Sequence, residues 1–137
     1  RPSMTAILSS PNNLVQGFLV AVHVCTVMGY WEYPPIAERY QVPIVITGFE
    51  PVDLLQGILQ VVRLLEAGNA VVENAYTRLV SFAGNQPAQS VIQRVFESCD
   101  QKWRGIGTIP GSGWRLRSEF DAFDAEKVFS FEQIQTQ

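Results

Sequence analysis

The chain has 137 residues, of which 47% are hydrophobic and 17% are charged, and its formal net charge is -3 at pH 7. This composition predicts one globular domain with a hydrophobic core and argues against an intrinsically disordered protein. The slightly negative charge, with Lys and Arg scattered along the chain, argues against a nucleic-acid-binding surface.

The first part of the chain predicts two strands, each followed by helical segments. Residues 3–9 are typical of the end of a helix, which the turn-forming residues 10–13 close. An uninterrupted apolar run at 15–22 predicts a strand that is buried on both faces, as in a parallel sheet. The remaining elements are expected at 24–29 (a helical turn that Gly29 ends), 31–40 (helix) and 42–47 (strand).

The strongest helical pattern covers residues 51–67, just after the second predicted strand. Pro51 suits the first helical position, and Asp53 adds a negative charge to the first turn, where the helix dipole favours it. Gly68 is expected to cap the end of this helix. Apolar side chains at three- and four-residue spacing form a stripe that predicts the buried face. The stripe consists of Leu54, Leu55, Ile58, Val61, Val62 and Leu65.

The second half of the chain has weaker patterns. A short strand is expected over 70–73, and residues 76–82 are ambiguous with a slight preference for strand. Residues 87–99 predict a second amphipathic helix, and 106–109 a short strand in a glycine-rich segment. The apolar face of that helix would consist of Ala88, Val91, Ile92, Val95 and Phe96. The tail at 118–137 has little periodicity and is expected to run over the surface.

Strands that alternate with helices indicate an α/β fold. We expect a mainly parallel sheet flanked by helices, in a Rossmann-like three-layer domain at residues 1–117, followed by a C-terminal extension or linker at 118–137. The chain begins Arg-Pro-Ser-Met inside a helical pattern, so we expect it to be a fragment of a longer protein.

Candidate functional residues follow the ends of the first two predicted strands. His23 comes directly after the strand at 15–22, and Glu50 lies three residues after the strand at 42–47. The carboxyl ends of parallel strands share one sheet edge, where α/β proteins gather ligands and catalytic groups. A histidine beside carboxylates suits proton transfer, metal binding or the holding of a polar ligand. His23, Glu50 and Asp53 are therefore the candidate catalytic residues.

Structural roles are also open for these side chains. His23 could serve only to hydrogen-bond a backbone carbonyl at a strand end, and Asp53 only to stabilise the N-terminus of its helix. Glu50 lies between Phe49 and Pro51, where a carboxylate that loses solvent needs a partner. Glu50 is therefore the stronger functional candidate of the two acids.

Cysteine content and hydropathy predict the environment of the protein. Cys25 and Cys99 do not make a disulfide framework, and His23-Val24-Cys25 is a weak metal signal because a closed zinc site needs four ligands. Both cysteines are expected to be buried structural thiols.

The apolar stretch at 18–28 is interrupted and too short to span a bilayer, so we expect no membrane contact. Reduced thiols and the lack of a signal peptide predict a cytoplasmic location.

The segment Trp103-Arg104-Gly105-Ile106-Gly107 leaves two interpretations open. It could place an indole and a guanidinium near a mobile loop, or it could hold a packed Trp beside an exposed Arg. Elsewhere, the sequence contains neither a phosphate-binding glycine loop nor a Gly-x-Ser-x-Gly nucleophile elbow.

Several segments, in this order, resemble the HypD family of hydrogenase formation proteins, which are maturation factors for nickel–iron hydrogenases. The most specific are Gly48-Phe49-Glu50-Pro51-Val52-Asp53 and the Trp103–Gly107 segment. The first of these blocks continues into Leu54-Leu55-Gln56-Gly57. The others are Ser10-Pro11-Asn12-Asn13, Gly17-Phe18-Leu19 leading to His23-Val24, Val72-Glu73-Asn74-Ala75-Tyr76-Thr77-Arg78, Gly84-Asn85, Ser112-Gly113 and Phe123-Asp124-Ala125-Glu126. The resemblance spans nearly the whole chain but only the middle and later-middle part of such a protein, its second α/β domain.

The resemblance implies a role in assembling the iron centre that carries cyanide and carbon monoxide ligands. It implies a cytoplasmic scaffold that works with the small chaperone HypC and with HypE, which supplies cyanide. It further implies a [4Fe-4S] cluster and redox-active cysteines in the full-length family. By position, His23, Glu50 and Asp53 would border the cleft in which the iron fragment is assembled.

The chain also departs from the family pattern. Ala21-Val22 stands where the family has Pro-Gly before the histidine, and Cys25 stands where it has serine, so Cys25 inherits no cysteine role. The family's cysteine motifs are missing. We therefore expect no cluster and no metal in this chain, which would act as part of a maturation scaffold rather than as a stand-alone enzyme.

Two other functions stay open. The domain could be a docking module for a HypC-like chaperone, in which the acids only brace the fold. It could also be an unrelated small-molecule α/β enzyme, although the lack of a phosphate loop or nucleophile motif counts against that function. Self-association is also compatible with the sequence, because an α/β sheet cut between domains exposes apolar surface.

Overall fold

The computed structural model describes residues 2–129, which form two compact units, one ending at Ser90 and the other beginning at Val91. The first unit contains α1 (Pro2–Leu8), β1 (Phe18–Ala21), α2 (Val22–Met28), α3 (Tyr33–Tyr40), β2 (Ile44–Thr47), α4 (Pro51–Glu66) and β3 (Val72–Asn74). Helix α5 (Gln86–Val95) runs from the first unit into the second. The domain boundary expected at residue 117 stays a prediction.

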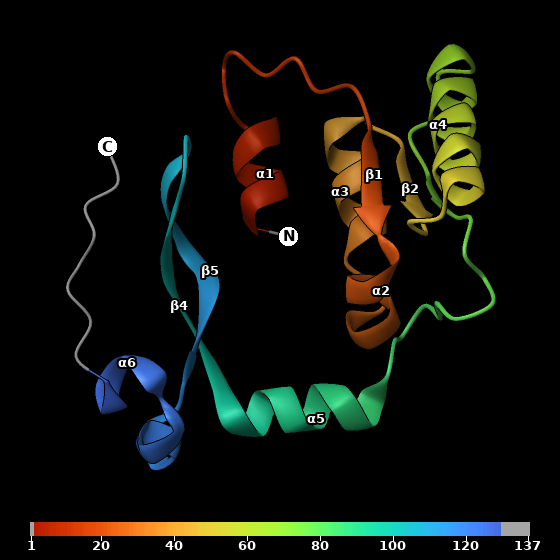
Figure 1. The fold of residues 1–137 in the computed structure, drawn as a ribbon. Helices are drawn as coiled ribbons and strands as arrows, with labels where there is room; N and C mark the ends of the chain where they lie inside the picture. The colour runs from red at the N-terminus through yellow and green to blue at the C-terminus, as the bar shows by residue number, and fades with distance from the viewer. Residues whose placement is uncertain (1, 130–137) are drawn as a thin grey trace. The chain divides into compact units, whose positions relative to one another are not determined.

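The first unit is built on a parallel sheet with the strand order β1-β2-β3. Figure 1 labels β1 and β2 of this sheet. In the register of the sheet, Val20 lies opposite Ile46, and Ile46 lies opposite Asn74. Each strand is followed by a helical or turn segment that leaves the same edge. This arrangement confirms the α/β fold with a parallel sheet flanked by helices.

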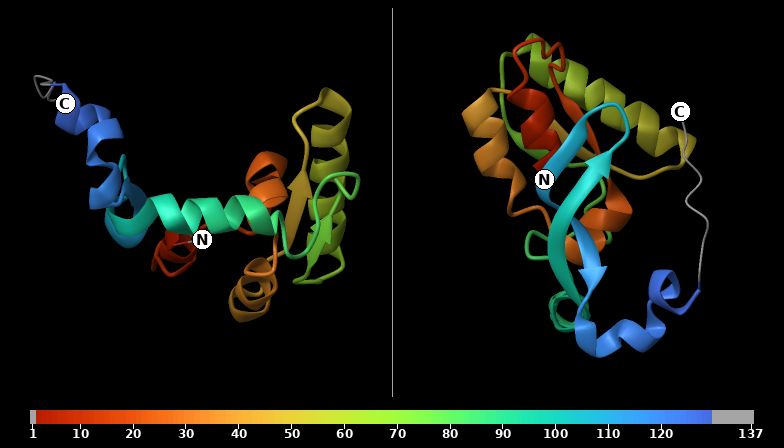
Figure 2. Two further views of the ribbon diagram at one scale, coloured as in Figure 1. Left: turned by 90° about the horizontal axis from the view of Figure 1, so that it is seen from below. Right: turned by 90° about the vertical axis from the view of Figure 1, so that its left-hand side faces the viewer.

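Helices cover both faces of the central strand β2, all four residues of which are buried. Ile44 and Ile46 belong to a core cluster on one face, and Val45 and Thr47 lie on the other because side chains alternate along a strand. Thr47 contacts Gly57 of α4, which runs alongside the sheet (Figure 2). The core cluster on the opposite face consists of Leu8, Val20, Cys25, Ile36, Ala37, Val42, Ile44, Ile46, Tyr76 and Val80.

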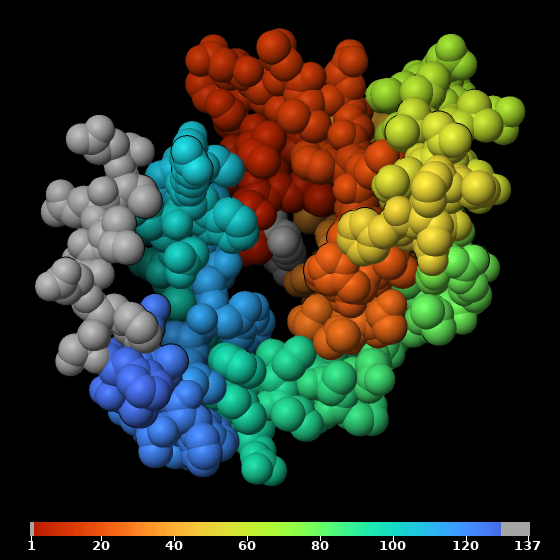
Figure 3. Space-filling view, viewed as in Figure 1, coloured from red at the N-terminus to blue at the C-terminus, as the bar shows by residue number. Residues whose placement is uncertain are grey.

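The predicted buried face of α4 is wrong. Leu55 and Ile58 are 68% and 47% exposed, whereas the buried residues of the helix are Gly57 and Leu64. Most residues of α4 are apolar all round the helix, so spacing alone does not select a face. The close approach that Gly57 permits selects it, and most of the predicted stripe is exposed, although Val61 is half-buried beside Gly17. Figure 3 shows the surface of the molecule with α4 in yellow to yellow-green.

Strand β1 is shorter than predicted at both ends, because it begins only at Phe18 and the chain enters α2 at Val22. Leu19 is 40% exposed, so burial on both faces is correct for β2 but not for β1, which lies at the edge of the described sheet. Gly29 ends α2 as expected, with a φ of 73° that suits glycine.

Residues 76–82 form a turn rather than the slightly favoured strand. The Asn74 side chain explains the difference, since its Oδ1 accepts a hydrogen bond from the Tyr76 N–H at 2.9 Å and its Nδ2 donates to the Val80 carbonyl at 3.0 Å. Such a side chain replaces the backbone partners that a strand would need. The turn then returns to α2, where the backbones of Gly29 and Gly84 meet.

In the second unit, the predicted helix at 87–99 is wrong at its end. The helix stops at Val95, and Phe96–Trp103 forms β4, which pairs antiparallel with β5 (Gly107–Leu116). The expected strand at 106–109 is therefore only the start of a longer one. Pairing with the next strand, β5, supplies these residues with backbone hydrogen bonds that the pattern of residues 87–99 alone does not reveal.

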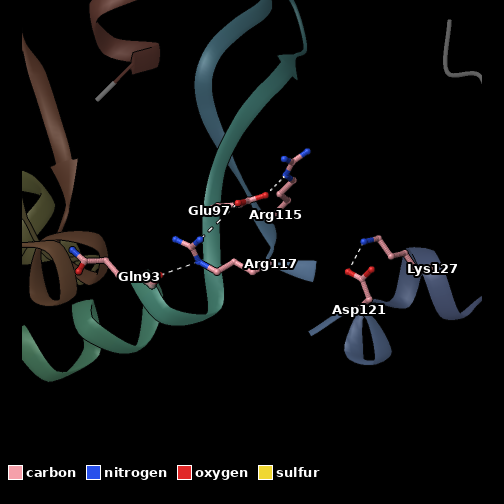
Figure 4. Close-up of polar contacts among 6 residues, drawn as sticks. All are labelled: Gln93, Glu97, Arg115, Arg117, Asp121 and Lys127. Atoms are coloured by element: carbon pink, nitrogen blue, oxygen red, sulfur yellow. Dashed lines mark hydrogen bonds and ion pairs between the residues drawn. The ribbon is translucent and has the colours of Figure 1, made fainter. Parts of the chain in front are cut away.

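Charged side chains join the two strands of this hairpin (Figure 4). Glu97 lies opposite Arg115, and its carboxylate accepts a hydrogen bond from the Arg115 Nε at 2.8 Å. The Arg117 Nη1 lies 3.8 Å from the Glu97 Oε2. Arg117 also donates to the Gln93 carbonyl, which ties the end of the hairpin to α5. These contacts fix the register at the base of the hairpin.

The segment after the hairpin forms a 3-10 helix at Ser118–Phe123 and the short helix α6 (Ala125–Val128). The Asp124 carboxylate caps α6 by accepting from the Glu126 N–H, and Lys127 pairs with Asp121 (Figure 4). Residues 130–137 of the expected extension lie outside the described residues. Within residues 2–129, none of the helices combines the length and apolar character needed to cross a membrane.

Candidate functional site

The candidate site lies at the edge where β1 and β2 end. Ala21 and Thr47, the last residues of these strands, are opposite each other in the register. His23 follows in the first turn of α2, and its ring stacks on that of Phe49 with centroids 5.3 Å apart and planes inclined by 23°. The fold therefore brings His23 next to the Gly48–Asp53 segment. The chemical roles of His23, Glu50 and Asp53 stay predictions.

The start of α4 positions the two carboxyl groups. Glu50 is the N-cap residue with an extended backbone, Pro51 opens the helix, and Asp53 lies in its first turn. The Thr47 hydroxyl donates a 2.7 Å hydrogen bond to the Asp53 carbonyl, which ties this turn to the end of β2. The Asp53 side chain is 14% exposed and that of Glu50 63%, so Asp53 is the inner acid of the pair.

Gly48 provides the space into which both carboxyl groups converge. A Cβ atom at this buried glycine would clash with the Asp53 Oδ2, and it would lie 2.9 Å from the Glu50 Oε2 and 2.6 Å from the Tyr76 ring. A side chain at this position would displace all three groups. The glycine of the Gly-Phe-Glu-Pro-x-Asp segment is therefore part of the geometry of the acidic pair.

Arg78 also belongs to this site, although the sequence reasoning assigned it no role. Its Nη2 atom donates to the Asp53 Oδ2 at 3.4 Å and lies 3.9 Å from the Glu50 Oε2, while its Cζ lies 3.8 Å from the Tyr76 ring centroid. The turn after β3 carries Arg78 and Tyr76 to the edge. Both residues follow the third predicted strand, at 70–73. The reasoning that singled out His23 and Glu50 after the first two strands would therefore have found them as well.

The two carboxyl groups have opposite pKa shifts. A hydrogen bond between the Glu50 and Asp53 side chains lowers the pKa of Glu50 and raises that of Asp53, because it stabilises a carboxylate on Glu50 and a proton on Asp53. Burial and the Glu50 charge further raise the pKa of Asp53, while the Arg78 guanidinium lowers the pKa of both acids. The pair can thus hold and exchange one proton.

The model of the HypD family, described as "Hydrogenase formation hypA family", matches residues 1–137. The chain belongs to the HypD family. The hydrogenase maturation factor HypD of Azotobacter vinelandii is 43% identical over 136 residues, which are 95% of this chain and 36% of that protein. The HypD of Escherichia coli strain K12 is 42% identical over 129 residues, 93% of this chain and 35% of the relative.

A third relative is the hydrogenase maturation factor HypD of Cupriavidus necator, 40% identical over 134 residues, which are 93% of this chain and 35% of that protein. The chain spans about a third of the length of the curated relatives it matches. The resemblance stated from the motifs is therefore confirmed at the level of the family.

The two cysteines of this HypD-family chain differ in their surroundings. Cys25 is fully buried in the core cluster, and burial raises the pKa of its thiol, which lies 4.0 Å from the Tyr33 hydroxyl. This confirms the expected burial of Cys25. Cys99, on β4, is only half-buried, so that expectation is wrong for it. Across residues 2–129, no group of three or more His, Cys, Asp and Glu side chains is placed to hold a metal ion.

The second family motif, Trp103–Gly107, forms the turn of the β4–β5 hairpin. The Trp103 indole N–H donates to the Ser112 hydroxyl at 2.7 Å, and Arg104 is exposed in the turn. Trp103 is itself 39% exposed, so the indole is not the packed Trp that the second interpretation expected, and both interpretations of this segment stay predictions.

Proposed function

We propose that this chain is part of a HypD-like scaffold for the maturation of nickel–iron hydrogenases. On this proposal, an iron fragment with cyanide and carbon monoxide ligands is the substrate, and His23, Glu50 and Asp53 border the place where it is assembled. The convergence of Glu50 and Asp53 above Gly48, in a chain of the HypD family, is the observation that carries the proposal.

The carboxyl pair would handle protons during this assembly. Asp53 is the member that holds the shared proton because its pKa is raised, and Glu50 is the member that stays ionised because its pKa is lowered and its side chain is open to solvent. The His23 imidazole adds a third polar group at the same edge, oriented by its stacking on Phe49.

The donor atoms of this chain do not fit a [4Fe-4S] cluster. Such a cluster takes four cysteine thiolates, and this chain contains two cysteines, of which Cys25 is enclosed in the core. No step of the proposal therefore passes through a cluster. A HypC-like chaperone and a HypE-like protein are the proposed partners, and the cytoplasm is the proposed location.

The test uses a full-length HypD-family protein that carries this segment, produced in cells that lack their own HypD. Glu50→Gln and His23→Ala are expected to lower hydrogenase maturation, because each removes a titratable group from the sheet edge. Glu66→Gln, an exposed acid at the far end of α4, is the matched control and should mature hydrogenase normally. Normal maturation in both site variants would contradict the proposal.

A second candidate function is protein docking. It is favoured by the exposed apolar side chains of α4, among which Val52 and Leu55 are 63% and 68% exposed. A pulldown of a purified HypC-like chaperone by the 137-residue chain, weakened in a Leu55→Asp variant, would support docking. Equal capture by both chains would contradict a docking role for α4.

A further inference from the structure

The guanidinium of Arg78 is held between an aromatic ring and two carboxyl groups. Its Cζ lies 3.8 Å from the Tyr76 ring centroid, and its Nη2 lies 3.4 Å from the Asp53 Oδ2 and 3.9 Å from the Glu50 Oε2. The side chains of Arg78 and Glu50 are 60% and 63% exposed, so neither is confined by burial. Their relative position depends on these contacts.

The ring beneath Arg78 is fixed in the core. Tyr76 is 9% exposed and belongs to the core cluster, and the Asn74 side chain holds both the Tyr76 N–H and the Val80 carbonyl. A planar guanidinium stacks on such a ring while its N–H groups still reach carboxylates, which an ammonium group does less well. Tyr76 therefore defines where the positive charge lies.

We propose that Arg78 is a positioning residue, fixed by the Tyr76 ring, that holds the Asp53 and Glu50 carboxyl groups in place above Gly48. This inference rests on the proposed function, in which the two acids handle protons. Arg78 would act through them, without itself accepting or donating the proton that is transferred. The turn after β3 would thus complete a site whose acids come from the start of α4.

The charges around the pair indicate what Arg78 contributes. Glu50 and Asp53 come from the start of α4, Tyr76 and Arg78 from the turn after β3, and His23 from α2 by way of its stacking on Phe49. Arg78 lowers the pKa of both carboxyl groups. Its removal should raise both values, because two acids would then face each other without this cation.

The direct test is an NMR titration of the Glu50 and Asp53 carboxyl carbons in the full 137-residue chain. Arg78→Gln is expected to raise both apparent pKa values by about half a unit or more. Tyr76→Leu, which leaves Arg78 but removes its platform, should produce part of this shift. Tyr76→Phe keeps the ring in the core but removes the side-chain hydrogen bond between Tyr76 and Arg78, so it should shift both titrations less than Tyr76→Leu does.

Arg39→Gln is the matched control, because Arg39 also lies over a tyrosine ring, that of Tyr40 at 5.3 Å, on α3. It should leave the titrations of Glu50 and Asp53 unchanged. Unchanged titrations in Arg78→Gln, or equal shifts in Arg39→Gln, would overturn the inference. Arg78→Lys keeps the charge and is expected to fold. Its pKa values for Glu50 and Asp53 should lie between those of Arg78→Gln and those of the original chain.

Hydrogenase maturation by the full-length protein separates this inference from the proposed function. If the acids act as proposed, Arg78→Gln should shift the pH profile of maturation to higher pH, and Arg39→Gln should not. Normal maturation by both Glu50→Gln and His23→Ala would overturn the proposed function, whereas the titrations alone decide whether Arg78 positions the pair.

Discussion

Gly57 of α4 lies directly against Thr47 of β2, and a Cβ atom at Gly57 would lie 2.9 Å from both the Cβ and the Oγ1 of Thr47. The Thr47 hydroxyl donates to the Asp53 carbonyl at 2.7 Å, so rotation of this side chain would break that bond. The contact selects the face of α4 that packs on the sheet. It also fixes the turn of α4 that carries Asp53.

Gly57→Ala should therefore destabilise the chain, although alanine is the better helix former. We expect a decrease of about 1–3 kcal/mol in the free energy of unfolding, because the added methyl group pushes α4 away from Thr47. Urea denaturation followed by circular dichroism measures this change. Gln56→Ala, at an exposed position of the same helix, is the control, and equal or higher stability in Gly57→Ala would contradict the packing described here.

The meeting of Gly29 and Gly84 gives a second prediction. Both residues have positive φ, and a Cβ atom on either would clash with the backbone of the other segment. Gly68 also has a positive φ, but the described residues leave open space around it. Gly68→Ala should lose about 1 kcal/mol of stability through backbone strain alone.

Gly29→Ala and Gly84→Ala should each lose about 2 kcal/mol more than Gly68→Ala, because steric overlap adds to the strain. Thermal and urea unfolding of the three variants provide the comparison. Similar losses at all three positions would show that the two backbones do not meet as described.

The two acids should titrate on opposite sides of their ordinary pKa values. The pKa of Asp53 is raised from the ordinary value for Asp and that of Glu50 is lowered from the ordinary value for Glu. Carboxyl-carbon NMR should show both displacements. In Glu50→Gln, the titration of Asp53 should move down, since the main causes of its raised pKa are removed. Ordinary titration of both acids in the unchanged chain would refute this coupling.

These shifts also set the sign of the pH dependence of stability. The contribution of Asp53 is fully present below its unfolded pKa and is lost as the pH rises through its folded pKa. The contribution of Glu50 is present above its unfolded pKa and is lost as the pH falls through its folded pKa. In unfolding curves measured across the acidic range, Asp53→Asn should abolish the loss of stability that Asp53 causes as the pH rises. The loss of stability that Glu50 causes as the pH falls should remain.

The two thiols should differ in reactivity. Cys25 is fully buried and its pKa is raised, so little thiolate is exposed to reagent, whereas Cys99 is half-buried on β4. Iodoacetamide should label Cys99 in the folded chain and Cys25 only in denaturant, as peptide mass spectrometry can measure. In Cys99→Ser, Cys25 is the remaining thiol, and its labelling should rise with the fraction of unfolded chain. Rapid labelling of Cys25 in the native chain would disprove its place in the core.

Local sequence patterns were sufficient where one segment decides its own structure. The β-branched run ending at Thr47 predicts β2, Pro51 predicts the start of α4, and Gly29 predicts the end of α2. Backbone preferences and helix-terminal chemistry act over a few residues, so these features can be read along the chain. The shared edge of parallel strands also follows from the strand order, and it indicates why His23 lies beside the Gly48–Asp53 segment.

Contacts between distant segments were decided only in the folded chain. The helix ends at Val95 because β5 supplies a partner for the residues that follow, and α4 turns Gly57 rather than its apolar stripe toward the sheet. Arg78 reaches the acids because the Asn74 side chain bends the chain after β3. Arg78 and Asp53 are 25 residues apart in the sequence, and they meet only because tertiary packing brings their segments together. The same holds for the pairing of strands and for the fit of α4 on the sheet, since each depends on surfaces that are not adjacent along the chain.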